Sequence, residues 1–291
     1  MDDDFDTTHF LGEDEIAYLR EAIDGEYHRD HARAVMGLLL DTLETQSDPE
    51  VRDEVVGVLR DLLPYLLGTG RFPAVAYLTG ELRKVTRTTK LEPRHKQALD
   101  QMRLAVSETD ALTQLFHVLD DGSVEPTPEA LGALLREMSQ DAVQSVLVWI
   151  GQLRHPRAKA ALVRSLEAYF LASPSSLEPM TTASDRAVVQ RAVAIAGKLQ
   201  NPDFAEPVAK ALEHRDPGTR RLAVSALSTI GTPAALKLAA RAVEDEDPEV
   251  RMTAFDAFTQ RPFRGVARTL STYLTTRDLE SLDGAEQLGL E

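Results

Sequence analysis

Apolar and polar positions in the C-terminal half of the chain alternate with the period of an α-helix. Across residues 216–231 apolar side chains recur every three or four positions, and a second stripe of the same kind follows across residues 233–243. Thr232 and Pro233 stand between the stripes. This pair is typical of a helix start, because threonine caps free N–H groups and proline tolerates the first helical position. Two short helices with one apolar stripe each cannot bury both stripes alone, so we expect helix pairs that stack on their neighbours.

The pattern recurs at a fixed interval. Asp185, Asp216 and Asp247 follow one another at 31 residues, and Pro202 and Pro233 fall in the same register. A fixed period of this length is the signature of a helical-repeat array. The sequence therefore predicts a chain built of repeated helix pairs.

One short motif indicates the type of repeat. Residues 247–251 read Asp-Pro-Glu-Val-Arg and are followed by Ala254 and Phe255, and the same pentapeptide stands at residues 48–52. This segment resembles the first helix of a HEAT repeat, of the HEAT and PBS-lyase type. The resemblance is clearest over residues 185–260. It implies an all-α fold, an α-α superhelix or HEAT-like solenoid, whose expected role is to hold other macromolecules.

The repeat pattern divides the chain into three predicted regions. Residues 1–12 form an acidic N-terminus that we expect to be mobile, and residues 13–125 form a divergent N-terminal helical bundle. Residues 126–291 form the HEAT-like array, interrupted by a loop insertion at residues 172–183, where serine and proline are frequent. Residues 278–291 read as the start of another helical unit. We therefore hypothesise that the chain is a fragment or that a partner covers its C-terminal end.

Aspartate and arginine recur four residues apart at the starts of the repeats. We interpret these pairs as structural, because aspartate caps the helix and arginine reaches a neighbouring turn. The alternative is a ladder of binding residues. The pairs are Asp48 with Arg52, Asp216 with Arg220, and Asp247 with Arg251.

The charge of the chain disfavours nucleic acid as a partner. Its formal net charge is -15, whereas nucleic-acid binding requires lysine and arginine to neutralise phosphates. Six basic residues nevertheless gather between positions 83 and 96, in a basic island that either contacts an acidic partner or complements acidic neighbours in the stack. The basic island consists of Arg83, Lys84, Arg87, Lys90, Arg94 and Lys96.

The second helices of the repeats supply the remaining candidate binding residues. In helical-repeat proteins that this chain resembles, these helices line an extended groove. We expect Lys210, Lys237, Arg241 and Glu213 to lie on the floor of that groove and to contact a protein partner.

No residue pattern supports catalysis or metal binding. The sequence contains no cysteine, no Gly-x-Ser-x-Gly motif and no glycine-rich phosphate loop. His28 and His31 stand near acidic residues, but the spacing favours a solvated loop. We therefore predict no catalytic, cofactor-binding or metal-binding residues. The N-terminus does not resemble a signal peptide, and no apolar run is long enough to cross a membrane, so we expect a cytoplasmic protein.

Three classes of function remain open. The first is a non-catalytic scaffold or adaptor that binds protein partners. The second is an enzyme or accessory subunit of the bilin-lyase-like HEAT type, which rests on fold analogy alone. The third is a structural module that associates with itself.

Overall fold

The computed structural model describes residue 12, residues 14–20 and residues 31–260, and these residues form helices and connecting turns without strands. Residues 14–20 are helical. The helices of the N-terminal half are α2 (His31–Thr45), α3 (Pro49–Gly68), α4 (Phe72–Thr88), α5 (Pro93–Ala105), α6 (Thr109–Asp120), α7 (Pro128–Leu135) and α8 (Gln140–Ile150). Those of the C-terminal half are α9 (Pro156–Ala172), η1 (Pro174–Leu177), α10 (Glu178–Thr181), α11 (Arg186–Leu199), η2 (Pro202–Phe204), α12 (Ala205–Lys210), η3 (Ala211–Glu213), α13 (Pro217–Ile230), α14 (Pro233–Ala239), η4 (Ala240–Glu244) and α15 (Pro248–Gln260).

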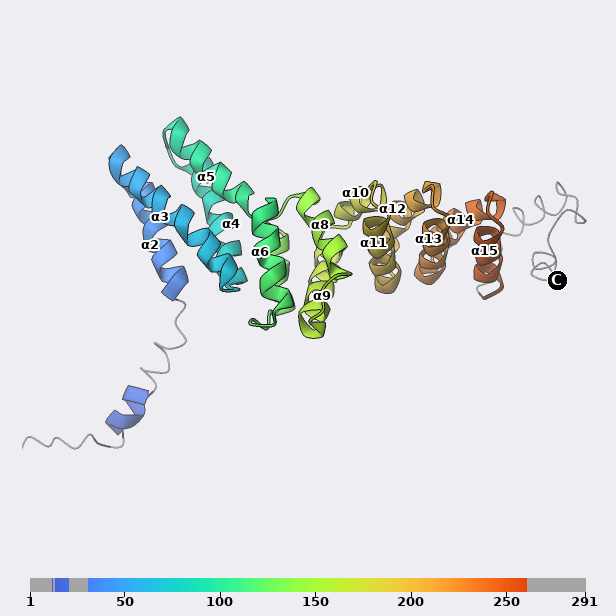
Figure 1. Cartoon of the computed structure of the whole chain (residues 1–291), viewed down its shortest axis with the longest axis horizontal. Coiled ribbons are helices and arrows are strands. Elements are labelled where there is room, and N and C mark those ends of the chain that lie inside the picture. Colours follow the sequence, from blue (N-terminus) through green and yellow to red (C-terminus); the bar gives the residue numbers. More distant parts are fainter. Residues whose placement is uncertain (1–11, 13, 21–30, 261–291) are drawn as a thin grey trace, which may run out of the picture.

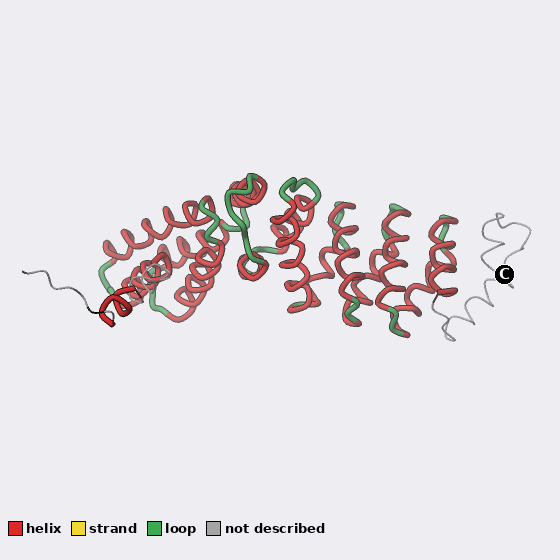
Figure 2. The backbone as a smooth tube through the Cα atoms, turned by 90° about the horizontal axis from the view of Figure 1, so that it is seen from below, coloured by secondary structure: helices red, strands yellow, loops and turns green. Residues whose placement is uncertain are grey.

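The helices stack in two layers along an elongated body (Figure 1). In the first layer α2 packs on α4, α4 on α7, and α7 on α9, and the series continues through α11, α13 and α15. In the second layer α3 packs on α5 and α6, and α10, α12 and α14 follow one another further along the chain. Figure 2 shows the C-terminal repeats as a row of similar hairpins. The all-α solenoid expected from the sequence is confirmed.

Aspartate side chains start the first helices of the C-terminal repeats. Asp185 Oδ1 accepts a hydrogen bond of 2.7 Å from the N–H of Ala187, and Asp216 Oδ2 accepts one of 2.8 Å from the N–H of Thr219. Thr232 caps α14 in the same way. Each cap satisfies an N–H group that has no partner inside its helix.

Small residues allow the first-layer helices to approach one another closely. A Cβ atom added at Gly197 in α11 would stand 3.0 Å from Cβ of Ala226 in α13. Ala223 and Leu227 of α13 are fully buried in the same contact layer of the core. Alanine and glycine therefore set the short distance between successive repeats, and leucine and valine fill the remaining space.

The prediction of a loop insertion at residues 172–183 is wrong. Residues 174–181 form η1 and α10, and α10 packs on α11 and α12 as the second helix of the unit that α9 begins. The serine-rich composition suggested a loop, but Leu177 and Met180 stand three residues apart and are both fully buried. These two side chains hold the segment against the core.

The N-terminal region continues the layered arrangement. Helices α2 to α6 occupy residues 31–120 and stack against one another and then against α7 and α8, within the region expected to form a divergent bundle. The expectation of a mobile N-terminus falls almost entirely on residues outside the described part of the chain. The hypothesis about residues 278–291 also lies outside it.

Candidate partner-binding surface

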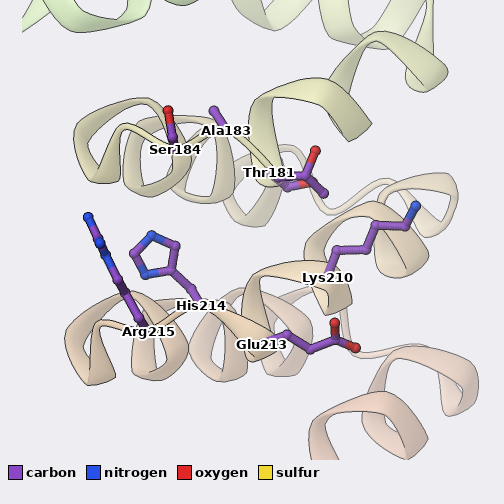
Figure 3. Close-up of a pocket in the computed structure, with 8 residues that line it drawn as sticks. Thr181, Ala183, Ser184, Lys210, Glu213, His214 and Arg215 are labelled. Carbon is purple, nitrogen blue, oxygen red and sulfur yellow. The ribbon is translucent and has the colours of Figure 1, made fainter.

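Two hollows lie in a row on the second-layer face of the C-terminal repeats. The first hollow, of about 400 Å³, separates the end of α10 from the end of α12 (Figure 3). The second hollow, of about 560 Å³, lies between α12 and α14. The first is lined by Thr181, Thr182, Ala183, Ser184, Lys210, Glu213, His214 and Arg215, and the second by Glu206, Ala234, Lys237, Leu238, Ala240, Arg241 and Glu244.

Charged residues in equivalent repeat positions line the two hollows. Lys210 lines the first hollow, and Arg241, 31 residues further on, lines the second. Glu213 and Glu244 are related by the same interval. These two successive repeats therefore present one cation and one carboxylate at equivalent positions of this face.

The sequence-predicted residues of the groove floor all line these hollows. Lys210, Lys237, Arg241 and Glu213 are exposed. Lys210 forms an ion pair with Glu178 of α10. Within residues 31–260, Lys237 and Arg241 form no ion pair. Their charges are therefore free to meet a bound molecule.

The basic island divides into paired and unpaired residues. Arg83 pairs with Glu137 at 3.2 Å, and Lys84 pairs with Glu81 at 2.6 Å. Arg94 contacts Asp53 at 3.0 Å and also pairs with Glu92. The part of the chain that the structure describes offers no ion-pair partner to the other three, which are Arg87, Lys90 and Lys96.

The arginines of the repeat motif point into the stack. Arg220 is 6% exposed and binds the carboxylate of Asp245 through two nitrogens, at 2.8 and 2.9 Å. Arg251 donates to the carbonyl of Asp245 at 2.8 Å, and Arg52 donates to the carbonyl of Lys90 at 3.3 Å. These arginines therefore tie helix starts to the turns beside them.

Hydrogen bonds lower the pKa of Asp216, a repeat aspartate near the first hollow. The Thr219 hydroxyl donates to Asp216 and lowers the pKa of this carboxyl below its ordinary value. The Thr219 N–H and the Arg186 guanidinium act in the same direction. Asp216 is therefore held as a carboxylate by its neighbours and is committed to the stack.

A second set of hollows lies in the N-terminal half and has no counterpart in the sequence-based predictions. It runs along α3, α5 and α6, and two adjoining hollows of about 420 and 210 Å³ share Leu63, Pro64, Ala105 and Glu108. These residues come from separate helices without a common motif or repeat register. The sequence therefore carried no local signal for this surface.

Two further observations concern metal ions and membranes. Among residues 12, 14–20 and 31–260, no group of three or more histidine and acidic side chains is placed to hold a metal ion. In the same residues, no helix combines the length and apolar character that crossing a lipid bilayer requires.

Comparison with known proteins identifies the repeat type. Residues 174–259 match the family model of HEAT repeats. No curated protein matches the chain. One solved structure that resembles it is the crystal structure of an engineered protein from the Northeast Structural Genomics Consortium, at 16% identity over 86% of this chain and 76% of that chain, with a TM-score of 0.30. The family match, on a stack of paired helices with a recurring aspartate and arginine, identifies residues 174–259 as HEAT-like repeats.

Proposed function

We propose that this protein is a non-catalytic scaffold that binds a protein partner along the second-layer face of its C-terminal repeats. The recurrence of charged residues in successive hollows is the observation that supports this proposal. Lys210 and Arg241 share one repeat position, and Glu213 and Glu244 share another. A purely structural residue needs no such placement at the rim of an open hollow.

The repeat spacing suits an extended polypeptide. Packed helices lie about 8–10 Å apart, and an extended chain advances by about 3.3 Å per residue. One repeat therefore corresponds to roughly three residues of a bound strand. A partner segment with acidic or polar side chains at every third position fits the row formed by Lys210 and Arg241.

The scaffold proposal predicts which face of the protein contacts a partner. A photo-crosslinking amino acid is placed at Lys237 or Arg241 in the full-length chain, and the host cells are irradiated. The matched control carries it at Ser225, which is exposed on α13 in the first layer of the same repeats. We expect one protein to be crosslinked at both second-layer positions and not at Ser225.

Two results would contradict the proposal. Equal yields at Ser225 and Arg241 would mean that contacts do not select the second-layer face. An absence of crosslinks from all three positions would leave the face without a partner. The charge-reversed variant Arg241→Glu serves as a further check, because it removes the cation and is expected to reduce crosslinking from Lys237.

Self-association is a second candidate, favoured by apolar side chains at the N-terminal end of the array. Val35 and Leu38 of α2 are 53% and 68% exposed, and Val58 and Tyr65 of α3 are 51% and 59% exposed. Exposed apolar residues in neighbouring helices are typical of contact surfaces. Light scattering over a concentration series tests this candidate, and a mass that rises for the natural chain but not for Leu38→Glu supports it.

A further inference from the structure

The linker before α15 carries acids that hold a buried arginine. Asp245 binds Arg220 through both carboxylate oxygens, and Glu246 contacts the same guanidinium at 3.3 Å. Hydrogen bonds to Asp245 raise the pKa of Arg220 above its ordinary value. In this repeat Asp245 and Glu246 therefore stabilise the stack.

In the linker one repeat earlier, the two equivalent residues are basic and not acidic. His214 and Arg215 stand 31 residues before Asp245 and Glu246, and fully buried Val189 stands 31 residues before Arg220. Within residues 31–260, the side chains of this linker therefore have no equivalent of the buried Arg220 to bind. Arg215 forms no ion pair within residues 31–260 and is exposed at the first hollow.

Backbone hydrogen bonds fix the position of this linker. Arg220 donates to the carbonyls of His214 and Arg215, at 2.9 and 3.2 Å. The N–H of Asp216 donates to Nδ1 of His214 at 3.0 Å, so the neutral imidazole carries its proton on Nε2. The linker therefore presents an imidazole N–H and a guanidinium from a constrained backbone.

The side chains of His214 and Arg215 lie together at one end of the first hollow. Figure 3 shows His214 and Arg215 extending from one linker toward the linker that carries Ser184, with Lys210, Glu213 and Thr181 at the other end. Glu213, the acidic residue of the lining, thus lies beside Lys210, away from the Ser184 end. The hydroxyls of Thr181 and Thr182 donate to the carbonyl of Glu178, so they do not add to this donor set.

From this arrangement we infer that His214 and Arg215 form a site for the phosphate group of a phosphoserine or phosphothreonine on the bound partner. A phosphate offers three acceptor oxygens and nearly two negative charges. The guanidinium supplies a two-point contact, and the imidazole N–H supplies a single donor. This inference rests on the proposed scaffold function and adds the chemistry of one contact.

The site is tested with peptides that need no knowledge of the partner. The isotope-labelled full-length protein is titrated with a seven-residue glycine-alanine peptide that carries phosphoserine at its centre, and NMR follows the His214 ring and the backbone of residues 182–185 and 213–216. The same peptide with serine or with glutamate is the reference. We expect binding of the phosphopeptide at least tenfold tighter than that of either reference peptide.

Variants separate a specific site from general charge attraction. Arg215→Glu is expected to weaken phosphopeptide binding at least tenfold. Arg164→Glu makes the same charge change at an exposed position of α9 and is expected to have no effect. Unchanged amide spectra away from the hollow show that each variant is folded.

Three outcomes would overturn the inference. These are equal binding of the phosphorylated and unphosphorylated peptides, equal loss in Arg164→Glu and Arg215→Glu, and equal binding of the glutamate peptide. Any of them would leave the scaffold proposal standing, because crosslinking from Lys237 and Arg241 does not depend on a phosphate. Conversely, failure of crosslinking with retained phosphopeptide binding would contradict the scaffold proposal alone.

Discussion

Arg220 and Asp245 form a buried two-point ion pair that joins the first helix of one repeat to the turn that begins the next. Their side chains are 6% and 10% exposed, and the two N–O distances are 2.8 and 2.9 Å. The same guanidinium binds the carbonyls of His214 and Arg215 in the preceding linker. One side chain thus connects the linkers on both sides of α13.

Removing the carboxylate of Asp245 should destabilise the protein strongly. Asp245→Ala leaves the Arg220 charge buried without its main partner, and such losses cost about 3–5 kcal/mol in the free energy of unfolding. Urea denaturation followed by circular dichroism measures the change. Glu246→Ala is the matched control, because Glu246 is 86% exposed, and it should cost less than about 1 kcal/mol. Similar costs for the two variants would show that the buried pair has no special role.

A second stability prediction follows from the ends of two equivalent helices. Gln200 follows α11 with φ of 53°, and Gly231 follows α13 with φ of 67°, in the same repeat position. Left-handed backbone is strained for residues other than glycine. Gln200→Gly should therefore raise the free energy of unfolding by about 0.5–1 kcal/mol.

The control for this change places glycine inside a helix. Ser225→Gly lies in the middle of α13, where glycine costs up to about 1 kcal/mol relative to better helix formers. Thermal unfolding of both variants should therefore move in opposite directions. A lower melting temperature for Gln200→Gly would show that strain at this turn is relieved in some other way.

Much of the fold was predictable because local signals and the repeat agreed. Asp216 caps its helix, Thr232 precedes the second helix, and both functions follow from residue type and position. Residues 174–181 were mistaken for a loop because Leu177 and Met180 are the main apolar residues in a polar segment. A helix of four residues is too short for periodicity to reveal.

The candidate surface was predictable only in part. Lys210, Lys237 and Arg241 could be assigned to second helices from the repeat register, and they line the hollows. The change from Asp245 and Glu246 to His214 and Arg215 was also present in the sequence. Its meaning depends on the buried contact of Arg220 and on the open space beside Ser184, and neither can be read from residue order.

Acid should weaken the protein partly through Asp120. The N–H of Arg154 donates to its carboxylate at 2.6 Å, and this bond, followed by those of the Arg154 guanidinium, lowers the pKa of Asp120 below its ordinary value. A lowered pKa in the folded state means that the contribution to stability is complete above the ordinary value of about 4 and is lost as the pH falls through the folded-state value.

The variant Asp120→Asn isolates this contribution. The difference in free energy of unfolding between the natural chain and the variant should be largest near pH 6 and should shrink as the pH falls below about 4. Urea denaturation at several pH values measures it. A difference that stays constant or grows toward acid pH would contradict the assignment to this carboxylate.

The basic island offers a test of which cations serve the stack. Arg83→Glu places a second carboxylate beside Glu137, which is only 12% exposed, whereas Arg87→Glu changes an exposed residue that forms no ion pair within the described residues. Loss of the Arg83 pair should cost up to about 1 kcal/mol, with repulsion from Glu137 adding to it, and Arg87→Glu should stay within about 0.5 kcal/mol of the natural chain. Denaturation in urea at low and high salt measures both changes in stability, and salt should reduce the effect of Arg83→Glu.

Charge reversals at Arg87, Lys90 and Lys96 are expected to leave the stack intact, so they can report on partner binding by the basic island. A reversal that includes Arg83 would instead combine an effect on binding with an effect on stability.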